Sequence, residues 1–171
     1  MKKDLIYITL RPVAKSEYAK VAELAEEIWQ DCYKDILSPE QIRYMLKMMY
    51  SQDAIADDVA EKTRYRFILD DEEIIGFLAW GPFIPDPPVA KLHKLYLRTS
   101  SQGMGVGSYT LNLLKRQLKD AGYHYVRLNV NRQNTKAIKT YTRNGFQTIQ
   151  TVDNDIGNGF FMKDYVMESE V

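Results

Sequence analysis

The residues best suited to chemistry form a glycine loop, the segment Gln102–Gly107, in which three glycines alternate with other residues. Glycine has no Cβ, so the backbone of such a loop can approach a ligand closely. A helical pattern follows from Ser108, and the N–H groups at a helix N-terminus attract anions. The loop therefore predicts a site for a phosphate or pyrophosphate, although a glycine-rich turn without a ligand has the same pattern.

Two elements must position this loop. Upstream, the segment Lys91–Leu97 is apolar and strand-like. Downstream, apolar residues of the run 109–118 recur three and four positions apart, which indicates a helix that ends near Ala121. Gly122 then fits the left-handed residue that often terminates a helix.

The rest of the chain supplies alternating strands and helices. Ser16 is expected to cap the first helix, and Ser38 with Gln41 forms a capping box for the second. The segment 51–62 predicts a short helix or a loop, and Gly76 indicates a bulge or a close backbone contact. The predicted strands are 4–10, 65–69, 74–80, 90–97, 123–130, 146–152 and 160–167, and the predicted helices are 17–33, 39–50, 108–121 and 135–144.

This order of elements predicts an α/β (α+β) fold with a central mixed sheet of six to seven strands and helices on both faces. With 171 residues, the chain is expected to form a single domain, 1–171. Lys plus Arg and Asp plus Glu each number 23, so a general nucleic-acid binder, which carries a basic surplus, is not expected.

The compartment is expected to be cytoplasmic. The single cysteine, Cys32, excludes a disulfide within the chain. The apolar run 5–10 is too short for the core of a signal peptide, and no apolar run approaches the length that crosses a bilayer.

Three motifs carry a resemblance to a known family. Leu95–Leu97 followed by the glycine loop is similar to a Q/R-x-x-G-x-G/A pyrophosphate loop, and Asn134–Tyr141 is similar to N-x-x-A-x-x-x-Y. Asn144-Gly145-Phe146 contains the G-F that begins the sixth strand of the same family. With this spacing the chain resembles the GNAT superfamily of acetyl-CoA-dependent N-acetyltransferases over roughly residues 65–168.

The resemblance implies how acetyl-CoA is held. The strands at 90–97 and 123–130, the fourth and fifth of the family, should lie parallel and splay apart, and the pantetheine arm should pair with the exposed backbone of the first. The pyrophosphate should rest on the amides of the glycine loop, and no metal ion is expected. The implied cosubstrate-binding residues are Leu95, Tyr96, Leu97, Gln102, Gly103, Met104, Gly105, Val106, Gly107, Ser108 and Asn134.

The resemblance also implies catalytic residues. Tyr141 should point its hydroxyl at the thioester sulfur, where a weak acid with a pKa of about 10 can protonate the leaving thiolate; packing of Tyr141 on the sheet is the alternative. The acceptor ammonium must lose a proton before attack, and His93 has a suitable intrinsic pKa. His93 is therefore the candidate base, with a structural role, a substrate contact or a water chain as alternatives.

The acceptor pocket of the family is lined by its first two helices and its last hairpin. In this chain these segments offer aromatic residues and carboxylates, which suit a cationic amine; a core position for Trp29 and turn positions for the aspartates are the alternatives. The candidate substrate-binding residues are Trp29, Tyr33 and Asp164. The segment 155–167 also resembles a bacterial branch that includes polyamine acetyltransferases.

The sequence thus predicts transfer of the acetyl group of acetyl-CoA to a primary amine of a small molecule, polyamine-like or other, by direct attack in a ternary complex. The alternatives are a non-catalytic acetyl-CoA-binding sensor on the same fold and acetylation of a protein or peptide amine. The loop lacks the Gly-Lys-Ser/Thr ending of nucleotide-binding P-loops. An amine substrate is expected, without nucleic acid or membrane, and a homodimer is left open.

Overall fold

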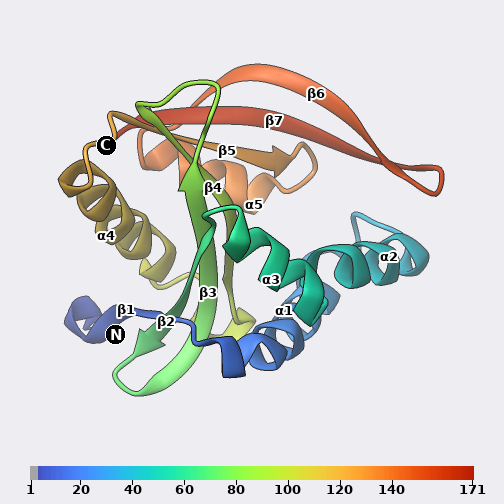
Figure 1. The fold of residues 1–171 in the computed structure, drawn as a ribbon, viewed down its shortest axis with the longest axis horizontal. Helices are drawn as coiled ribbons and strands as arrows, with labels where there is room; N and C mark the ends of the chain where they lie inside the picture. The colour runs from blue at the N-terminus through green and yellow to red at the C-terminus, as the bar shows by residue number, and fades with distance from the viewer. Residues whose placement is uncertain (1–3) are drawn as a thin grey trace. The chain divides into compact units, whose positions relative to one another are not determined.

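The computed structural model describes residues 4–171, and Figure 1 shows their helices and strands. These residues divide into two compact units. The first unit comprises residues 4–80 and Lys94–Val106, and the second comprises Gly81–His93 and Gly107–Val171. The helices are α1 (Tyr18–Cys32), α2 (Pro39–Tyr50), α3 (Gln52–Ala60), α4 (Val106–Asp120) and α5 (Thr135–Arg143). The strands are β1 (Ile8–Pro12), β2 (Arg64–Asp70), β3 (Glu73–Pro82), β4 (Val89–Leu97), β5 (Tyr125–Asn131), β6 (Gln147–Gly157) and β7 (Phe160–Glu170).

One mixed sheet contains all seven strands, in the order β1-β2-β3-β4-β5-β7-β6. This confirms the expected fold class and the upper end of the expected strand number. β3 and β4 each begin in one unit and end in the other, and the single-domain organisation stays a prediction.

The first strand begins later than the sequence pattern predicts. Asp4 accepts a hydrogen bond from the Ile6 backbone, and a 3-10 turn occupies Leu5–Tyr7. Strand pairing with β2 runs from Ile8 opposite Asp70 to Pro12 opposite Arg66. The strand predicted from residue 4 is therefore wrong over its first half, because an aspartate side chain competes locally with strand formation.

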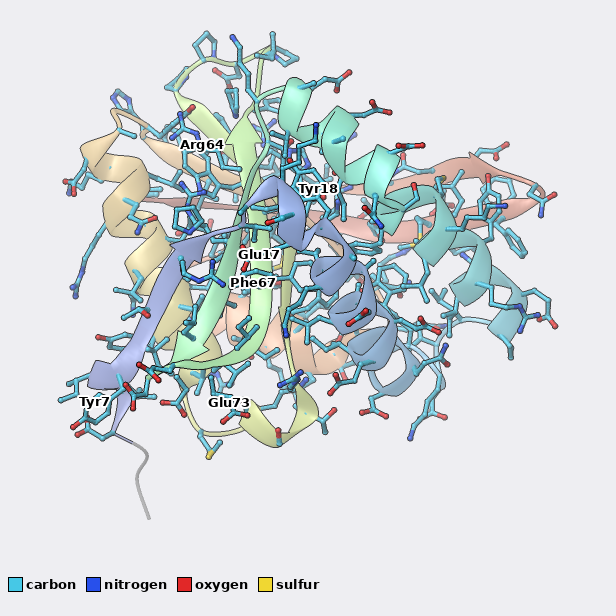
Figure 2. All side chains as sticks on the ribbon, turned by 60° about the horizontal axis from the view of Figure 1, so that its bottom comes forward. Tyr7, Glu17, Tyr18, Arg64, Phe67 and Glu73 are labelled. Atoms are coloured by element: carbon cyan, nitrogen blue, oxygen red, sulfur yellow. The ribbon has the colours of Figure 1, made fainter. Side chains whose placement is uncertain are left out.

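The start of α1 also differs from the prediction. Ser16 lies within a 3-10 turn, Lys15–Glu17, and does not cap the helix. The carboxylate of Glu17 accepts from the Ala14 backbone at 2.9 Å and from Arg11 at 2.9 and 3.0 Å. The Arg11 guanidinium also stacks 5.1 Å from the centroid of Phe67, which lies near Glu17 in Figure 2.

Serine caps define the next two helices. The Ser38 hydroxyl accepts from the Gln41 backbone at 3.1 Å, and proline occupies the first turn of α2, which confirms the predicted helix start. The side chain of Gln41 donates to Met45 Sδ at 3.9 Å. The Ser51 hydroxyl accepts from Ala54 at 3.1 Å and starts α3, which decides between the predicted helix and loop in favour of a helix. Each cap contributes about 1 kcal/mol to helix stability.

Gly76 of β3 is predicted to mark a bulge or a close backbone contact, and the structure has both. The β2–β3 register shifts where Ile68 pairs with Gly76 and Leu69 pairs with Ile74, so a bulge lies beside the glycine. A Cβ on Gly76 would lie 2.2 Å from the carbonyl oxygen of Tyr96. Only glycine allows this close approach of β3 to the end of β4.

In the second unit, β4 and β5 form the expected parallel pair. The pairs run from Val89 opposite Tyr125 to Leu92 opposite Leu128, and both strands continue beyond the last pair. This is the arrangement from which a splay develops, as the family resemblance implies. β7 pairs antiparallel with β5 from Glu170 opposite Tyr125 to Asp164 opposite Asn131.

The last two strands form a long twisted hairpin, which is longer than the sequence pattern predicts (Figure 1). Only Asn158 and Gly159 lie between the strands, with φ of 54° and 77°. Positive φ at two central residues is typical of a type I′ turn, which matches the twist of the flanking strands. The predicted six-residue turn is therefore wrong, because four of those residues extend β6.

Candidate functional site

Two residues of the glycine loop have left-handed backbone angles. Gly103 and Gly105 have φ of 76° and 81°, in the left-handed region, and α4 begins at Val106. A Cβ on Gly103 would meet no atom of residues 4–171 within 4 Å, and one on Gly105 would meet only Leu5 Cδ1, at 3.7 Å. The glycines are thus required by the backbone angles, and the space beside them is open to a ligand at the N-terminus of α4.

The strand that leads into the loop is fixed at its end by side chains of the first unit. Gln102 Nε2 donates to the Leu97 carbonyl at 2.9 Å. Arg98 donates its backbone N–H to Ile75 and its guanidinium to Ile74, each at 2.8 Å, and pairs with Glu27 at 3.3 Å. The Gln102 side chain therefore holds the turn between β4 and the loop.

The first turn of α4 is tied to the end of α5 within the second unit. Asn144 Nδ2 donates to the Ser108 hydroxyl at 2.8 Å and to the Thr140 carbonyl at 2.7 Å. Lys115 Nζ donates to the Asn144 carbonyl at 2.6 Å and to the Ser169 hydroxyl at 2.7 Å, while burial lowers its pKa. These contacts fix α4 against both α5 and β7.

Asn134 and Tyr141 lie at the two ends of α5. The Asn134 side-chain oxygen accepts from Ala137 at 3.3 Å and caps the helix, as predicted. The Tyr141 ring lies 5.5 Å from the ring of Phe146, which is 1% exposed, and Tyr141 itself is half-buried. Phe146 thus fixes the ring of Tyr141, whose role as an acid stays a prediction.

Trp29 and Tyr33 lie in an aromatic cluster of the first unit. The ring of Trp29 lies 4.6 Å from Tyr33, 5.7 Å from Tyr50 and 5.8 Å from Tyr96. The Tyr33 and Tyr96 hydroxyls are 3.2 Å apart, and burial raises the pKa of Tyr33 well above its ordinary value. Trp29 is 1% exposed and Tyr33 6% exposed, so both belong to the core, and their contact with an acceptor stays a prediction.

The side chain of Lys94 anchors α3 to the strand before the loop. Its Nζ donates to Asp58 at 2.9 Å and to the Tyr65 hydroxyl, and it lies 4.9 Å from the centroids of Tyr50 and Tyr65. Burial lowers the pKa of Lys94, while the ion pair with Asp58 opposes that shift. This buried lysine has a structural role beside the aromatic cluster.

Asp164 belongs to a polar cluster of the second unit that sequence reasoning does not detect in full. It is 6% exposed, and its Oδ1 has no hydrogen-bond partner among residues 4–171. Burial raises the pKa of Asp164, while hydrogen bonding from Asn129 and the charge of Lys91 oppose the rise. Lys91 Nζ in turn donates to Asn129 Oδ1. The polar alternation of Asn129 and Asn131 along β5 is the one sequence signal of this cluster.

His93 follows the last residue of β4 that pairs with β5, and its side chain is exposed. Leu95, Tyr96 and Leu97 complete the same strand and are half-buried.

Among the described residues, no cluster of His, Cys, Asp and Glu has the arrangement of a metal site. Within residues 4–171 no helix is long and apolar enough to cross a membrane.

Comparison with known proteins gives a family match over most of the chain. The model described as the acetyltransferase (GNAT) family matches residues 22–146. A curated spermidine N(1)-acetyltransferase from Thermoplasma acidophilum is 27% identical over 161 residues, which are 91% of this chain and 96% of the relative.

Solved structures have the same fold. A PaiA N-acetyltransferase from Thermoplasma acidophilum, crystallised in complex with coenzyme A, has a TM-score of 0.79 at 24% identity, over 96% of this chain and 99% of its own. A GCN5-related N-acetyltransferase from Rhodopseudomonas palustris has a TM-score of 0.79 at 16% identity, over 99% of both chains.

Proposed function

The chain belongs to the acetyltransferase (GNAT) family, and on that premise we propose that it acetylates a primary amine of a small, polyamine-like molecule. The donor in this proposal is acetyl-CoA, and the transfer is a direct attack in a ternary complex. The observation that carries the proposal is the open glycine loop at the start of α4. The coenzyme A bound to the PaiA structure and the spermidine named for the curated relative support it.

The residues of the loop fit the anionic part of the cosubstrate. Left-handed Gly103 and Gly105 leave open space at the N-terminus of α4, where free backbone N–H groups favour a pyrophosphate. The backbone of β4 from Leu95 to Leu97 is proposed to pair with the pantetheine arm, and Asn134 to contact that arm. When bound, acetyl-CoA supplies an activated acetyl group as a thioester.

Tyr141 is proposed as the general acid. Its hydroxyl would hold the proton that the leaving thiolate requires, because a phenol is a weak acid that can donate a proton in the transition state. The ring contact with Phe146 supports this role, because it restricts the direction of the hydroxyl. A backbone N–H of β4 is proposed to stabilise the oxyanion.

Asp164 is proposed to attract the cationic acceptor. A buried carboxylate with an unfilled hydrogen-bonding position among residues 4–171 favours an ammonium group nearby. Trp29 and Tyr33 support the acceptor side through Tyr96, which both rings contact from within the aromatic cluster. His93 is proposed to contact the acceptor or to take part in its deprotonation.

A screen of amines tests the function. Release of free thiol from acetyl-CoA is measured with polyamines, amino acids, aminoglycosides and peptides with free N-termini. The proposal expects the highest kcat/KM for a polyamine. Highest activity on peptides would indicate a protein acceptor, and acetyl-CoA binding by calorimetry without turnover on any amine would indicate a sensor.

A further inference from the structure

A polar face of the second unit holds side chains from three neighbouring strands. Residues that pair across a sheet point to the same side, so the register places these side chains together. Lys91 pairs with Arg127, and Asn131 pairs with Asp164. We define this polar face as Lys91, Arg127, Asn129, Asn131, Asp164 and Glu168.

The other side of the same strands carries α4 and the ring of Tyr141. Ser169, which pairs with Val126, accepts a hydrogen bond from Lys115 of α4. Lys115 also lies 5.0 Å from the centroid of Phe146, whose ring contacts Tyr141. Because side chains alternate along a strand, Val126 and Arg127 point to opposite sides. Tyr141 and Lys91 therefore lie on opposite sides of the sheet formed by β4, β5 and β7.

Lys91 stands at the place where the parallel pairing of β4 and β5 ends. It precedes Leu92, the last paired residue of β4. Its Nζ donates to Asn129 Oδ1, and that oxygen can accept from a lysine amine in either protonation state. Asn129 thus fixes the direction of one N–H of the Lys91 amine. The lone pair of the neutral Lys91 amine then points away from Asn129.

Charged groups on β5 and β7 influence the protonation of Lys91. On β5 lies Arg127, which is paired with Glu168 of β7 at 2.6 Å, and on β7 lies Asp164, with Arg132 also acting on it. His93 is two residues along β4. Burial and the charge of Arg127 lower the pKa of Lys91 to about 8, while Asp164 opposes the shift.

We propose that Lys91 is the base that takes the proton from the acceptor ammonium in the acetyl transfer proposed above. The neutral Lys91 amine accepts one proton from the acceptor R–NH3+, which leaves R–NH2 for attack and Lys91 as an ammonium. Lys91 then returns the proton to solvent. Acid and base lie on opposite sides of the sheet, as expected when the leaving sulfur and the attacking nitrogen reach one carbonyl carbon from different directions.

Two neighbours of Lys91 are positioning residues in this proposal. Asn129 orients the amine through its carbonyl oxygen and donates toward Asp164. Asp164, as an anion, favours the protonated form of Lys91 and so restricts how far its pKa falls. Arg127 acts in the opposite direction, because a nearby positive charge disfavours a second one.

The test compares the pH dependence of kcat/KM in the full chain, with the best amine from the screen. The plot of kcat/KM against pH for wild type should have a rising limb near pH 8, where Lys91 loses its proton. Lys91→Arg keeps the charge but cannot accept a proton at these pH values. A general base contributes at least about 100-fold, so Lys91→Arg should lose about that much and retain only the rise with the amine's own ionisation, near pH 10.

Matched variants separate this role from a structural one. Lys163→Met removes an exposed lysine from the opposite side of β7 and should leave the profile unchanged. Asp164→Asn should move the limb to lower pH, and Arg127→Gln should move it to higher pH. These opposite shifts test Lys91 even where Lys91→Arg folds poorly. His93→Gln should leave the limb in place, because with Lys91 as the base His93 only contacts the acceptor.

The outcomes distinguish the inference from the proposed function. Wild-type turnover with an unchanged limb in Lys91→Arg, or loss of the limb in His93→Gln, would overturn the role of Lys91 and leave the acetyltransferase proposal intact. Normal acetyl-CoA affinity of Lys91→Arg by calorimetry is expected, since Lys91 lies outside the glycine loop. Absence of turnover on every amine in wild type would overturn both proposals.

Discussion

Asn144 donates its side-chain amide to the hydroxyl of Ser108 at 2.8 Å, which joins the C-terminus of α5 to the first turn of α4. The same amide donates to Thr140, one turn back along α5. The helix that carries Tyr141 is thereby linked to the helix whose N-terminus is proposed to bind the pyrophosphate. A change at Asn144 should therefore affect both stability and cosubstrate affinity.

Asn144→Ala should lower the free energy of unfolding by about 1 to 2 kcal/mol, because it removes two hydrogen bonds worth about 1 kcal/mol each. It should also weaken acetyl-CoA binding, since Ser108 loses its partner. Urea denaturation and calorimetry measure the two effects. The control is Asn154→Ala, at an exposed position of β6, where a change of less than about 0.5 kcal/mol is expected. Equal effects of the two substitutions would contradict the proposed link.

Gly105→Ala and Gly122→Ala test the two ends of α4. Gly105 has φ of 81° and Gly122 has φ of 90°, so alanine should cost each site about 1 to 2 kcal/mol of stability. Only Gly105→Ala places a Cβ in the open space of the glycine loop. Its acetyl-CoA affinity should fall at least about tenfold, or about 1.4 kcal/mol, whereas Gly122→Ala should bind normally. Calorimetry that finds equal losses would remove the loop as the anion site.

The fold was predictable wherever a local signal acts alone. The N-cap at Ser38 and the αL residue Gly122 determine helix ends through short-range hydrogen bonds and backbone angles, and both are confirmed. Predictions failed where two local signals compete. The sequence predicts that Ser16 caps α1, but the Glu17 carboxylate accepts from Ala14 and Arg11 instead, and Arg11 lies on the preceding strand.

The candidate site was predictable as far as motifs describe it. The positive φ of Gly103 and Gly105 and the cap at Asn134 agree with the pattern of the sequence. The polar face is different, because Lys91, Asn129 and Asp164 lie on three strands that no motif connects. Their proximity depends on the β4–β5 and β5–β7 registers, which a single sequence does not specify.

Tyr141→Phe should lower kcat about 100-fold or more, because the hydroxyl is the proposed proton donor and the ring is retained. Packing against Phe146 should be preserved, so stability and acetyl-CoA affinity should remain close to wild type. Steady-state kinetics with calorimetry measures both. Tyr125→Phe, at an exposed tyrosine of β5, is the matched control. A kcat within about threefold of wild type would exclude Tyr141 as the acid.

Asp164→Asn should stabilise the protein at neutral pH while it weakens binding of the cationic acceptor. Burial raises the pKa of Asp164 above its ordinary 3.8, so the folded state binds a proton more tightly than the unfolded state. The stability that this proton contributes is present below pH 3.8 and is lost as pH rises through the folded pKa. The stability advantage of the variant should therefore increase as pH rises from 4 to 7.

Urea denaturation at several pH values measures this advantage. Asp153→Asn is the control, because Asp153 is exposed and pairs with Arg132 on the other side of the hairpin. It should lose about 0 to 1 kcal/mol at neutral pH, the usual contribution of a surface ion pair. An Asp164→Asn variant that is less stable than wild type at neutral pH would mean that the carboxylate has a favourable partner. The role of Asp164 in attracting a cationic acceptor would then lose its physical basis.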